Sequence, residues 1–238
     1  RWDTSGRVVV DGPVYSLATV DAANATNMNI VTYASAVGIR PERVWVVSLY
    51  KGTKTHANWF DATSPYYGRG VLQLLADEHS PLIWPLGGAS GKETDKAAAC
   101  AAFGLPWTAR RETNQSDPLI KVLPKCAAYV DLEMTATYPA GDHDVVICRV
   151  DGAEQKRVES ESGTSIAAPH LTTQMLRDRG AITEAGRAVE PLSSEEEEPP
   201  DESPVASVAF TETLCEDPRV FRAPSALSRA ECDAVRAA

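Results

Sequence analysis

The stretch AAYVDLEMTATYPAGDHDVVICRV, residues 127–150, decides the fold class of this chain. Residues 127–138 alternate between apolar and polar side chains, which is typical of a strand with one face buried. The segment PAGDH at 139–143 has the proline and glycine of a tight turn, and the apolar run after it indicates a returning strand. The stretch therefore predicts an antiparallel β-hairpin.

Strand signals also dominate the chain before this hairpin. RVWVVSLY at 43–50 is a run of β-branched and aromatic residues between Pro41 and Gly52, and GVLQLL at 70–75 is a second apolar run. The expected strands are short and are separated by turns, with few helices between them. This pattern favours an antiparallel barrel or sandwich over a parallel sheet.

The helices that the sequence predicts are few. Ser90, with Glu93 three residues later, forms a capping box for an alanine-rich helix over residues 92–103, which Gly104 ends. A second helix is expected over residues 170–180. The sequence therefore predicts a mainly β fold with helices at its periphery.

The composition excludes several classes of function. The 238 residues carry a net charge of −10, which argues against binding of a nucleic-acid backbone. No apolar run approaches the roughly 20 residues needed to span a bilayer, so we expect a soluble protein without a membrane partner. The five cysteines are scattered without a CxxC pair, which indicates neither a disulfide framework nor a zinc site. A reducing intracellular compartment fits best, either the cytoplasm or an organelle such as the plastid.

The composition changes abruptly near residue 188. Between Glu190 and Glu202 the chain has seven acids and no base. Such a segment has few apolar side chains to bury, so we predict a disordered linker. The expected organisation is a folded domain over residues 1–187, an acidic linker rich in Pro and Glu over 188–206, and a short C-terminal segment over 207–238.

Two short motifs point to other functions, and their context speaks against both. GTSIAAPH at 163–170 resembles the serine box of the subtilisin-like proteases, in which Ser165 would be the nucleophile. None of the four histidines follows that family's His-Gly-Thr pattern, so we do not expect a serine hydrolase. GGASGKET at 87–94 has Leu86 and Glu93 at two positions where a P-loop needs glycine and a hydroxyl. Nucleoside triphosphate binding is therefore not expected either.

Five segments over about residues 13–182, taken in order, resemble the flavin reductase-like family, whose members have an FMN-binding split β-barrel. They are PVYSLATVDAANATNMNIVTYASAVGIRP at 13–41, VWVVSLYKGTKTHANW at 44–59, GVLQLL at 70–75, YPAGDHDVVICRV at 138–150 and LTTQMLRDRGAIT at 171–183. Each segment is a weak signal alone, whereas their shared order is specific. The resemblance implies a mainly β fold, an antiparallel split β-barrel of Greek-key type with peripheral helices, followed by a disordered acidic tail.

The same resemblance implies a function. It is that of an FMN-binding oxidoreductase in which NAD(P)H passes hydride to flavin N5, with FAD as the alternative flavin. The implied partners are the small-molecule flavin and nicotinamide and a second copy of the chain, because family members are commonly homodimers with the cofactor near the interface. The alternative is a split barrel kept as a binding or scaffold module, which holds flavin without turnover.

The segment YKGTKTHAN at 50–58 has the chemistry of a phosphate site. Lysines supply charge, threonines supply hydroxyls, and Gly52 lets backbone N–H groups approach closely. The alternative is a solvated basic turn. By resemblance to the family, the residues of the phosphate loop are Lys51, Thr53, Thr55 and Asn58. The residues that would bind the isoalloxazine edge of the flavin are Thr32, Tyr33, Ala34 and Ser35. Asn29 belongs to the same sequence motif as these four and is also assigned to the flavin site.

His143 is the catalytic residue that the resemblance implies, since the family's histidine in this turn lies near flavin and nicotinamide. The alternative is a turn residue linked to Asp142 and Asp144. We expect no metal site, because no second histidine or cysteine stands at ligand spacing. Two departures from the family are Gln73, where an asparagine is usual, and Cys148, where a glycine is common.

Residues 217–235 resemble the start of the catalytic domain of prolyl 4-hydroxylase-like oxygenases, with Glu231 and Cys232 as its glutamate-cysteine pair. This likeness implies the beginning of a second domain. The family's iron ligands would follow Ala238, so oxygenase activity is not expected of this chain. The alternative is an amphipathic helix.

Overall fold

The computed structural model describes residues 10–110, 120–160 and 162–191. From residue 192 onward, the predicted acidic linker and the segment with the oxygenase likeness lie outside the described residues. No described helix is long and apolar enough to cross a membrane.

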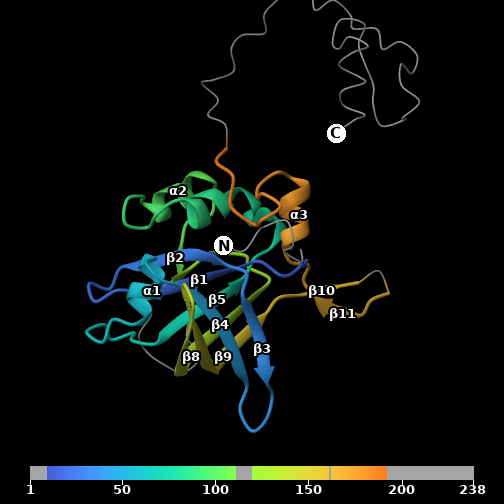
Figure 1. Ribbon diagram of the computed structural model, residues 1–238. Coiled ribbons are helices and arrows are strands. Elements are labelled where there is room, and N and C mark those ends of the chain that lie inside the picture. Colours follow the sequence, from blue (N-terminus) through green and yellow to red (C-terminus); the bar gives the residue numbers. More distant parts are fainter. Residues whose placement is uncertain (1–9, 111–119, 161, 192–238) are drawn as a thin grey trace, which may run out of the picture. The chain divides into compact units, whose positions relative to one another are not determined.

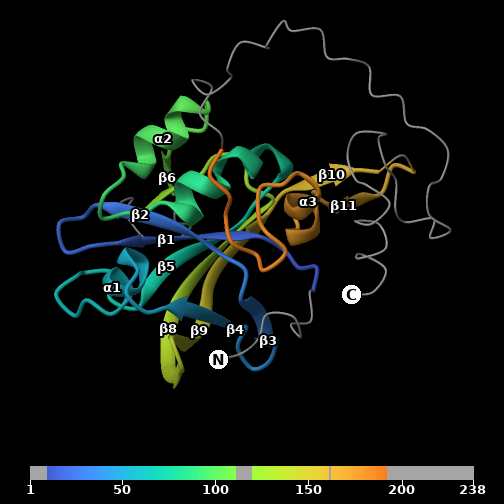
Figure 2. The ribbon, with the colours of Figure 1, turned by 45° about the horizontal axis from the view of Figure 1, so that its top comes forward.

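Seven strands form one antiparallel sheet, in which the expected strands at 43–50 and 70–75 and the expected hairpin at 127–150 are all present (Figure 1). The strand order is β2-β1-β5-β8-β9-β4-β3. β8 and β9 are the longest strands and run side by side through the barrel wall (Figure 2). The seven strands are β1 (Tyr15–Val20), β2 (Thr26–Val31), β3 (Ala34–Gly38), β4 (Val44–Tyr50), β5 (Arg69–Leu74), β8 (Ala128–Ala140) and β9 (His143–Gln155).

The two edges of this sheet are consecutive in the chain. β2 ends at Val31 and β3 begins at Ala34, so only Thr32 and Tyr33 separate them. Three Cα steps span at most about 11 Å, whereas the edges of a flat seven-stranded sheet would lie about 29 Å apart. The sheet must therefore roll up, and no ladder among the described strands pairs β2 with β3 along the resulting split. The predicted antiparallel split β-barrel is confirmed.

Two hydrophobic clusters share strand β1. Leu17 packs inside the barrel with Val47, Leu72 and Trp59, which is fully buried. The next residue, Ala18, belongs to the cluster between the sheet and the helices. Because all six residues of β1 are buried, the strand shows no apolar–polar alternation.

The helices are short and lie at the periphery, with α2 and α3 above β1 and β2 in the view of Figure 1. They are α1 (Lys54–Trp59), α2 (Lys96–Ala102) and α3 (Thr173–Asp178), with the short 3₁₀-helix η2 (Asp77–Leu82) and the π-helical turn η3 (Trp84–Gly88). Two small ribbons complete the fold, β6 (Thr108–Ala109) with β7 (Lys121–Val122) and β10 (Arg157–Glu159) with β11 (Ser165–Ala167).

The predicted start of the alanine-rich helix is wrong. The carboxylate of Asp95 caps α2 by accepting a hydrogen bond of 3.0 Å from the backbone N–H of Ala98. The carbonyl of Ser90 instead closes a separate turn with the N–H groups of Glu93 and Thr94. The predicted end is confirmed, because Gly104 follows α2 with a φ of 73°.

Lys96 joins α2 to β2 and η3. Its side chain is buried, and Nζ donates to the carbonyls of Met28 at 3.1 Å and Leu86 at 2.6 Å. Burial away from water lowers the pKa of the ammonium group to about 8. The folded protein therefore releases a proton at a pH where the unfolded chain still binds it.

This release predicts a pH-dependent contribution to stability. Between pH 8 and 10.5 the unfolded chain binds more protons at Lys96 than the folded protein does. The contribution of Lys96 to the free energy of unfolding therefore rises with pH over this range, by on the order of 3 kcal/mol. Compared with Lys96→Met, the wild type should gain that amount between these two pH values in denaturant titrations. Lys156→Met, at an exposed lysine, is the control. A difference between wild type and Lys96→Met that is independent of pH would contradict the prediction.

Candidate functional site

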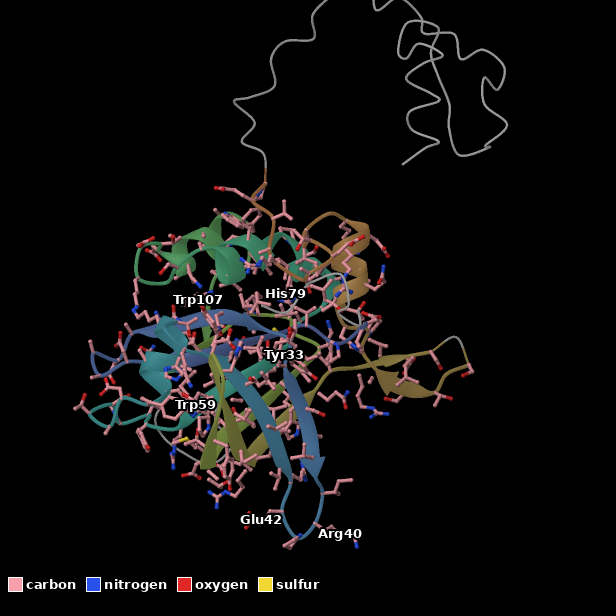
Figure 3. All side chains as sticks on the ribbon, in the orientation of Figure 1. Tyr33, Arg40, Glu42, Trp59, His79 and Trp107 are labelled. Carbon is pink, nitrogen blue, oxygen red and sulfur yellow. The ribbon has the colours of Figure 1, made fainter. Side chains whose placement is uncertain are left out.

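A cleft of about 860 Å³ opens at the junction of β2 and β3. The barrel contributes Thr32 and Tyr33 of the junction, and Tyr33 lies at the upper end of β3 (Figure 3). Further lining residues come from the ends of β4 and β9, from η3 and α3, and from the segment that follows α3. They include Tyr50, His143, Gly87, Gly88, Leu176, Arg177, Ile182, Glu184 and Arg187.

Three rings gather at this cleft. Tyr50 pairs with His143 in the β4–β9 ladder, and their ring centroids are 5.3 Å apart. Tyr33 meets the same imidazole edge-on at 6.0 Å. Both tyrosines are 53% exposed, and both line the cleft.

An ionic cluster fixes the turn that carries His143. Asp144 lies 2.8 Å from Nε2 of His56 and 3.4 Å from Nζ of Lys51, and the same Nζ donates to the carbonyl of Gly141 at 2.9 Å. The hydrogen bond from His56, and then Lys51, hold the pKa of Asp144 below its usual value. The turn is thereby tied to the chain after β4.

His143 itself is hydrogen-bonded to its neighbour. Nδ1 lies 2.7 Å from a carboxylate oxygen of Asp142, and this bond lowers the pKa of Asp142. An ionised carboxylate at Nδ1 favours the tautomer in which Nδ1 carries the proton. The Nε2 atom is then the one that can exchange a proton with a ligand.

Most residues assigned to the phosphate loop belong to α1 and its N-cap. The hydroxyl of Thr53 caps the helix by accepting from the N–H of His56 at 3.1 Å. Thr55, 1% exposed, accepts a hydrogen bond of 2.8 Å from Nδ2 of Asn27. Asn58, 5% exposed, donates to the hydroxyl of Thr19. The side chains of Thr55 and Asn58 thus point into the protein.

The residues assigned to the isoalloxazine edge divide into two groups. Thr32 and Tyr33 line the cleft with His143. Ala34 packs against the barrel cluster, and the exposed hydroxyl of Ser35 donates to the carbonyl of Ala36. Asn29 is not among the lining residues, and its Oδ1 is buried without a hydrogen-bond partner among the described residues.

Sequence reasoning missed Tyr50, Arg177 and Arg187. The signal for Tyr50 was its place at the end of an expected strand and at the start of the segment 50–58 assigned to phosphate. The strand register places it opposite His143. Arg177 lies in the family-like segment LTTQMLRDRGAIT at 171–183, which does not by itself indicate a role for this arginine. The position of Arg187 at the cleft depends on how the segment after α3 folds back onto the barrel, which no local sequence pattern shows.

Two further expectations from the sequence concern a serine hydrolase site at Ser165 and a metal site. Ser165 lies on the exposed ribbon of β10 and β11, where its hydroxyl accepts a hydrogen bond of 2.8 Å from Nε of Arg157 rather than from a histidine. Within the described ranges, no three His, Cys, Asp or Glu side chains form a group that could hold a metal ion.

The hydrogen bond between Thr55 and Asn27 leads to a stability prediction. Thr55→Val leaves the buried amide of Asn27 without its acceptor, which should lower the free energy of unfolding by about 1–3 kcal/mol. Thr94→Val, at an exposed threonine, should change it by less than about 0.5 kcal/mol. Equal effects of the two substitutions in urea titrations would show that the bond stabilises nothing.

Comparisons with known proteins agree with this fold. Residues 7–177 match the flavin reductase like domain family. A search of the curated proteins finds no match. Flavoredoxin from Methanosarcina acetivorans is 12% identical with a TM-score of 0.53, over 70% of this chain and 80% of that chain. An FMN-binding protein from Thermus thermophilus, with bound 1-cyclohex-2-enone, is 19% identical with a TM-score of 0.52, over 72% and 93%.

A Sinorhizobium meliloti protein is 20% identical with a TM-score of 0.50, over 62% of this chain, and the match spans 45% of that protein's length. At these identities the solved structures show the fold alone. The family match covers most of the chain and supports a flavin-related oxidoreductase activity. The chain therefore belongs to the flavin reductase-like domain family.

Proposed function

We propose that this protein is an NAD(P)H-dependent flavin reductase that binds FMN in the cleft at the β2–β3 junction. The observation that carries the proposal is the meeting of Thr32, Tyr33 and His143 in one cleft, in a chain of this family. FAD is the alternative flavin.

The cleft fits a flat ring system. Its volume of about 860 Å³ falls in the range of about 300–1,000 Å³ that is typical of small-molecule sites. The rings of Tyr33, Tyr50 and His143 offer apolar faces, and the hydroxyl of Thr32 offers a polar group at the edge. In this proposal Thr55 and Asn58 support α1 from within, and Lys51 holds the turn of His143.

The residues of the chain orient a ligand and manage a proton. When bound, the flavin would accept hydride from the reduced nicotinamide at N5. Asp142 holds Nδ1 of His143, so Nε2 can hold or release a proton at the cleft. Residues of the segment Ile182–Ala188 line the cleft on the side of α3.

FMN titration and NAD(P)H oxidation test the proposal. The wild type should quench FMN fluorescence and consume NADH or NADPH. His143→Gln should bind FMN within about threefold of the wild type and lower kcat by about 100-fold, because a proton-exchanging group contributes on that order. His170→Gln, at an exposed histidine outside the cleft lining, is the control. Absence of quenching would overturn the proposal, whereas quenching without NAD(P)H consumption would identify a binding module.

We also propose that the protein is a homodimer through the face around β3. Val37 of β3 is exposed, Ile39 directly after the strand is exposed to 79%, and Tyr33 directly before the strand is exposed to 53%. Exposed apolar side chains gathered on one edge strand mark interaction surfaces. A partner on this face would cover the strand edge beside the cleft.

The homodimer is tested by mass in solution. In sedimentation experiments the wild type should have twice the chain mass of 25.6 kDa, and Val37→Glu combined with Ile39→Glu should have the mass of one chain. Ile166→Glu places the same charge at an exposed apolar residue of β11 and should remain dimeric. A monomeric wild type at micromolar concentration would refute the dimer.

A further inference from the structure

Part of the cleft wall comes from a small hairpin after α3. Ile182 and Ala188 form an isolated antiparallel bridge. Thr183 and Arg187 close the turn, because the N–H of Thr183 donates to the carbonyl of Arg187 at 2.8 Å and the N–H of Arg187 donates to the hydroxyl of Thr183. The backbone of Arg187 is therefore held by hydrogen bonds, and the residue is one of those that line the cleft.

Two guanidinium groups of this wall have no acidic partner. Arg177 donates from Nη1 to the hydroxyl of Thr173 at 3.3 Å, and its Nε is buried without a hydrogen-bond partner among the described residues. The guanidinium of Arg187 forms no ion pair with any carboxylate in the described part of the chain. Glu184, which also lines the cleft, forms no ion pair with either arginine. By contrast, carboxylates partner Arg69, Arg110, Arg149 and Arg179.

The cations and hydroxyls beside β4 are already engaged. The amine of Lys51 contacts Asp144 and the carbonyl of Gly141, and Lys54 pairs with Asp21 at 3.5 Å. The hydroxyl of Thr53 caps α1. The positive charges of the cleft that have no carboxylate partner in the described chain therefore lie on the wall formed by α3 and the hairpin. A phosphate group in the cleft would bind there. Guanidinium groups also match phosphate geometry, because their donors form bidentate hydrogen bonds.

We propose that Arg177 and Arg187 form an anion subsite that binds a phosphate group of the ligand in this cleft. The inference rests on the proposed function for the identity of the ligand. A flavin mononucleotide and a nicotinamide dinucleotide both carry a phosphate ester on a ligand with a planar ring. Both would place the ring against Tyr33 and Tyr50 and the phosphate against the arginines.

Inorganic pyrophosphate tests the subsite without a flavin. Millimolar pyrophosphate should raise the Tm of the wild type, and Arg187→Gln should lose that shift, as should Arg177→Gln. Arg187→Gln is the decisive variant, because its backbone bonds hold the hairpin whatever the side chain is. Arg179→Gln is the matched control, since Arg179 pairs with Asp77 and does not line the cleft.

Ligand pairs then identify the source of the phosphate. If it is the flavin, Arg187→Gln should weaken FMN binding about tenfold and leave riboflavin binding unchanged. If it is the dinucleotide, FMN binding should be unchanged and ADP-ribose binding should weaken by a similar factor. If pyrophosphate, FMN and ADP-ribose all bind both variants as they bind the wild type, the proposed subsite is wrong. The proposal of flavin reduction would then still stand. If the wild type binds pyrophosphate through these arginines but does not quench flavin fluorescence, the subsite is supported and flavin reduction is refuted.

Discussion

The connection of β2 to β3 through Thr32 and Tyr33 is the constraint on which the rest of the structure depends. These strands are the two edges of a seven-stranded sheet, and two residues cannot bridge a flat sheet of that width. The sheet rolls up, and its edges meet without pairing. The cleft opens at this meeting point, so the same short connection shapes the barrel and supplies two residues of the candidate site.

The site is assembled from the ends of strands that the barrel brings together. Tyr50 ends β4 and His143 begins β9, and the ladder between them sets their rings side by side with the planes tilted by 58°. Asp144 then links the turn before β9 to Lys51 and His56 after β4. Lys51, which the family resemblance assigns to the phosphate loop, is engaged in these contacts. In the described chain, the cations of the cleft without a carboxylate partner are therefore Arg177 and Arg187 on the opposite wall.

Local sequence patterns predicted the elements whose signal is local. Alternation and a proline–glycine turn were enough for the β8–β9 hairpin, and Gly104 for the end of α2. They selected Ser90 as the helix cap, whereas the structure has Asp95, and both residue types are good caps. They also missed α1, because the helix is only six residues long, contains the weak helix former Thr55, and is held by tertiary hydrogen bonds with Asn27 and Thr19. For the site, Thr32, Tyr33 and His143 were found through a resemblance, and Tyr50 and Arg187 required the register and the folded chain.

The burial of β1 on both faces has a consequence for how the domain comes apart. Leu17 and Ala18 are neighbours in the chain, yet each belongs to a different apolar cluster. Neither the barrel interior nor the helical layer can open without exposing one face of this strand to water. We therefore see the two layers as a single cooperative unit, in which the amide hydrogens of β1 exchange only through global opening.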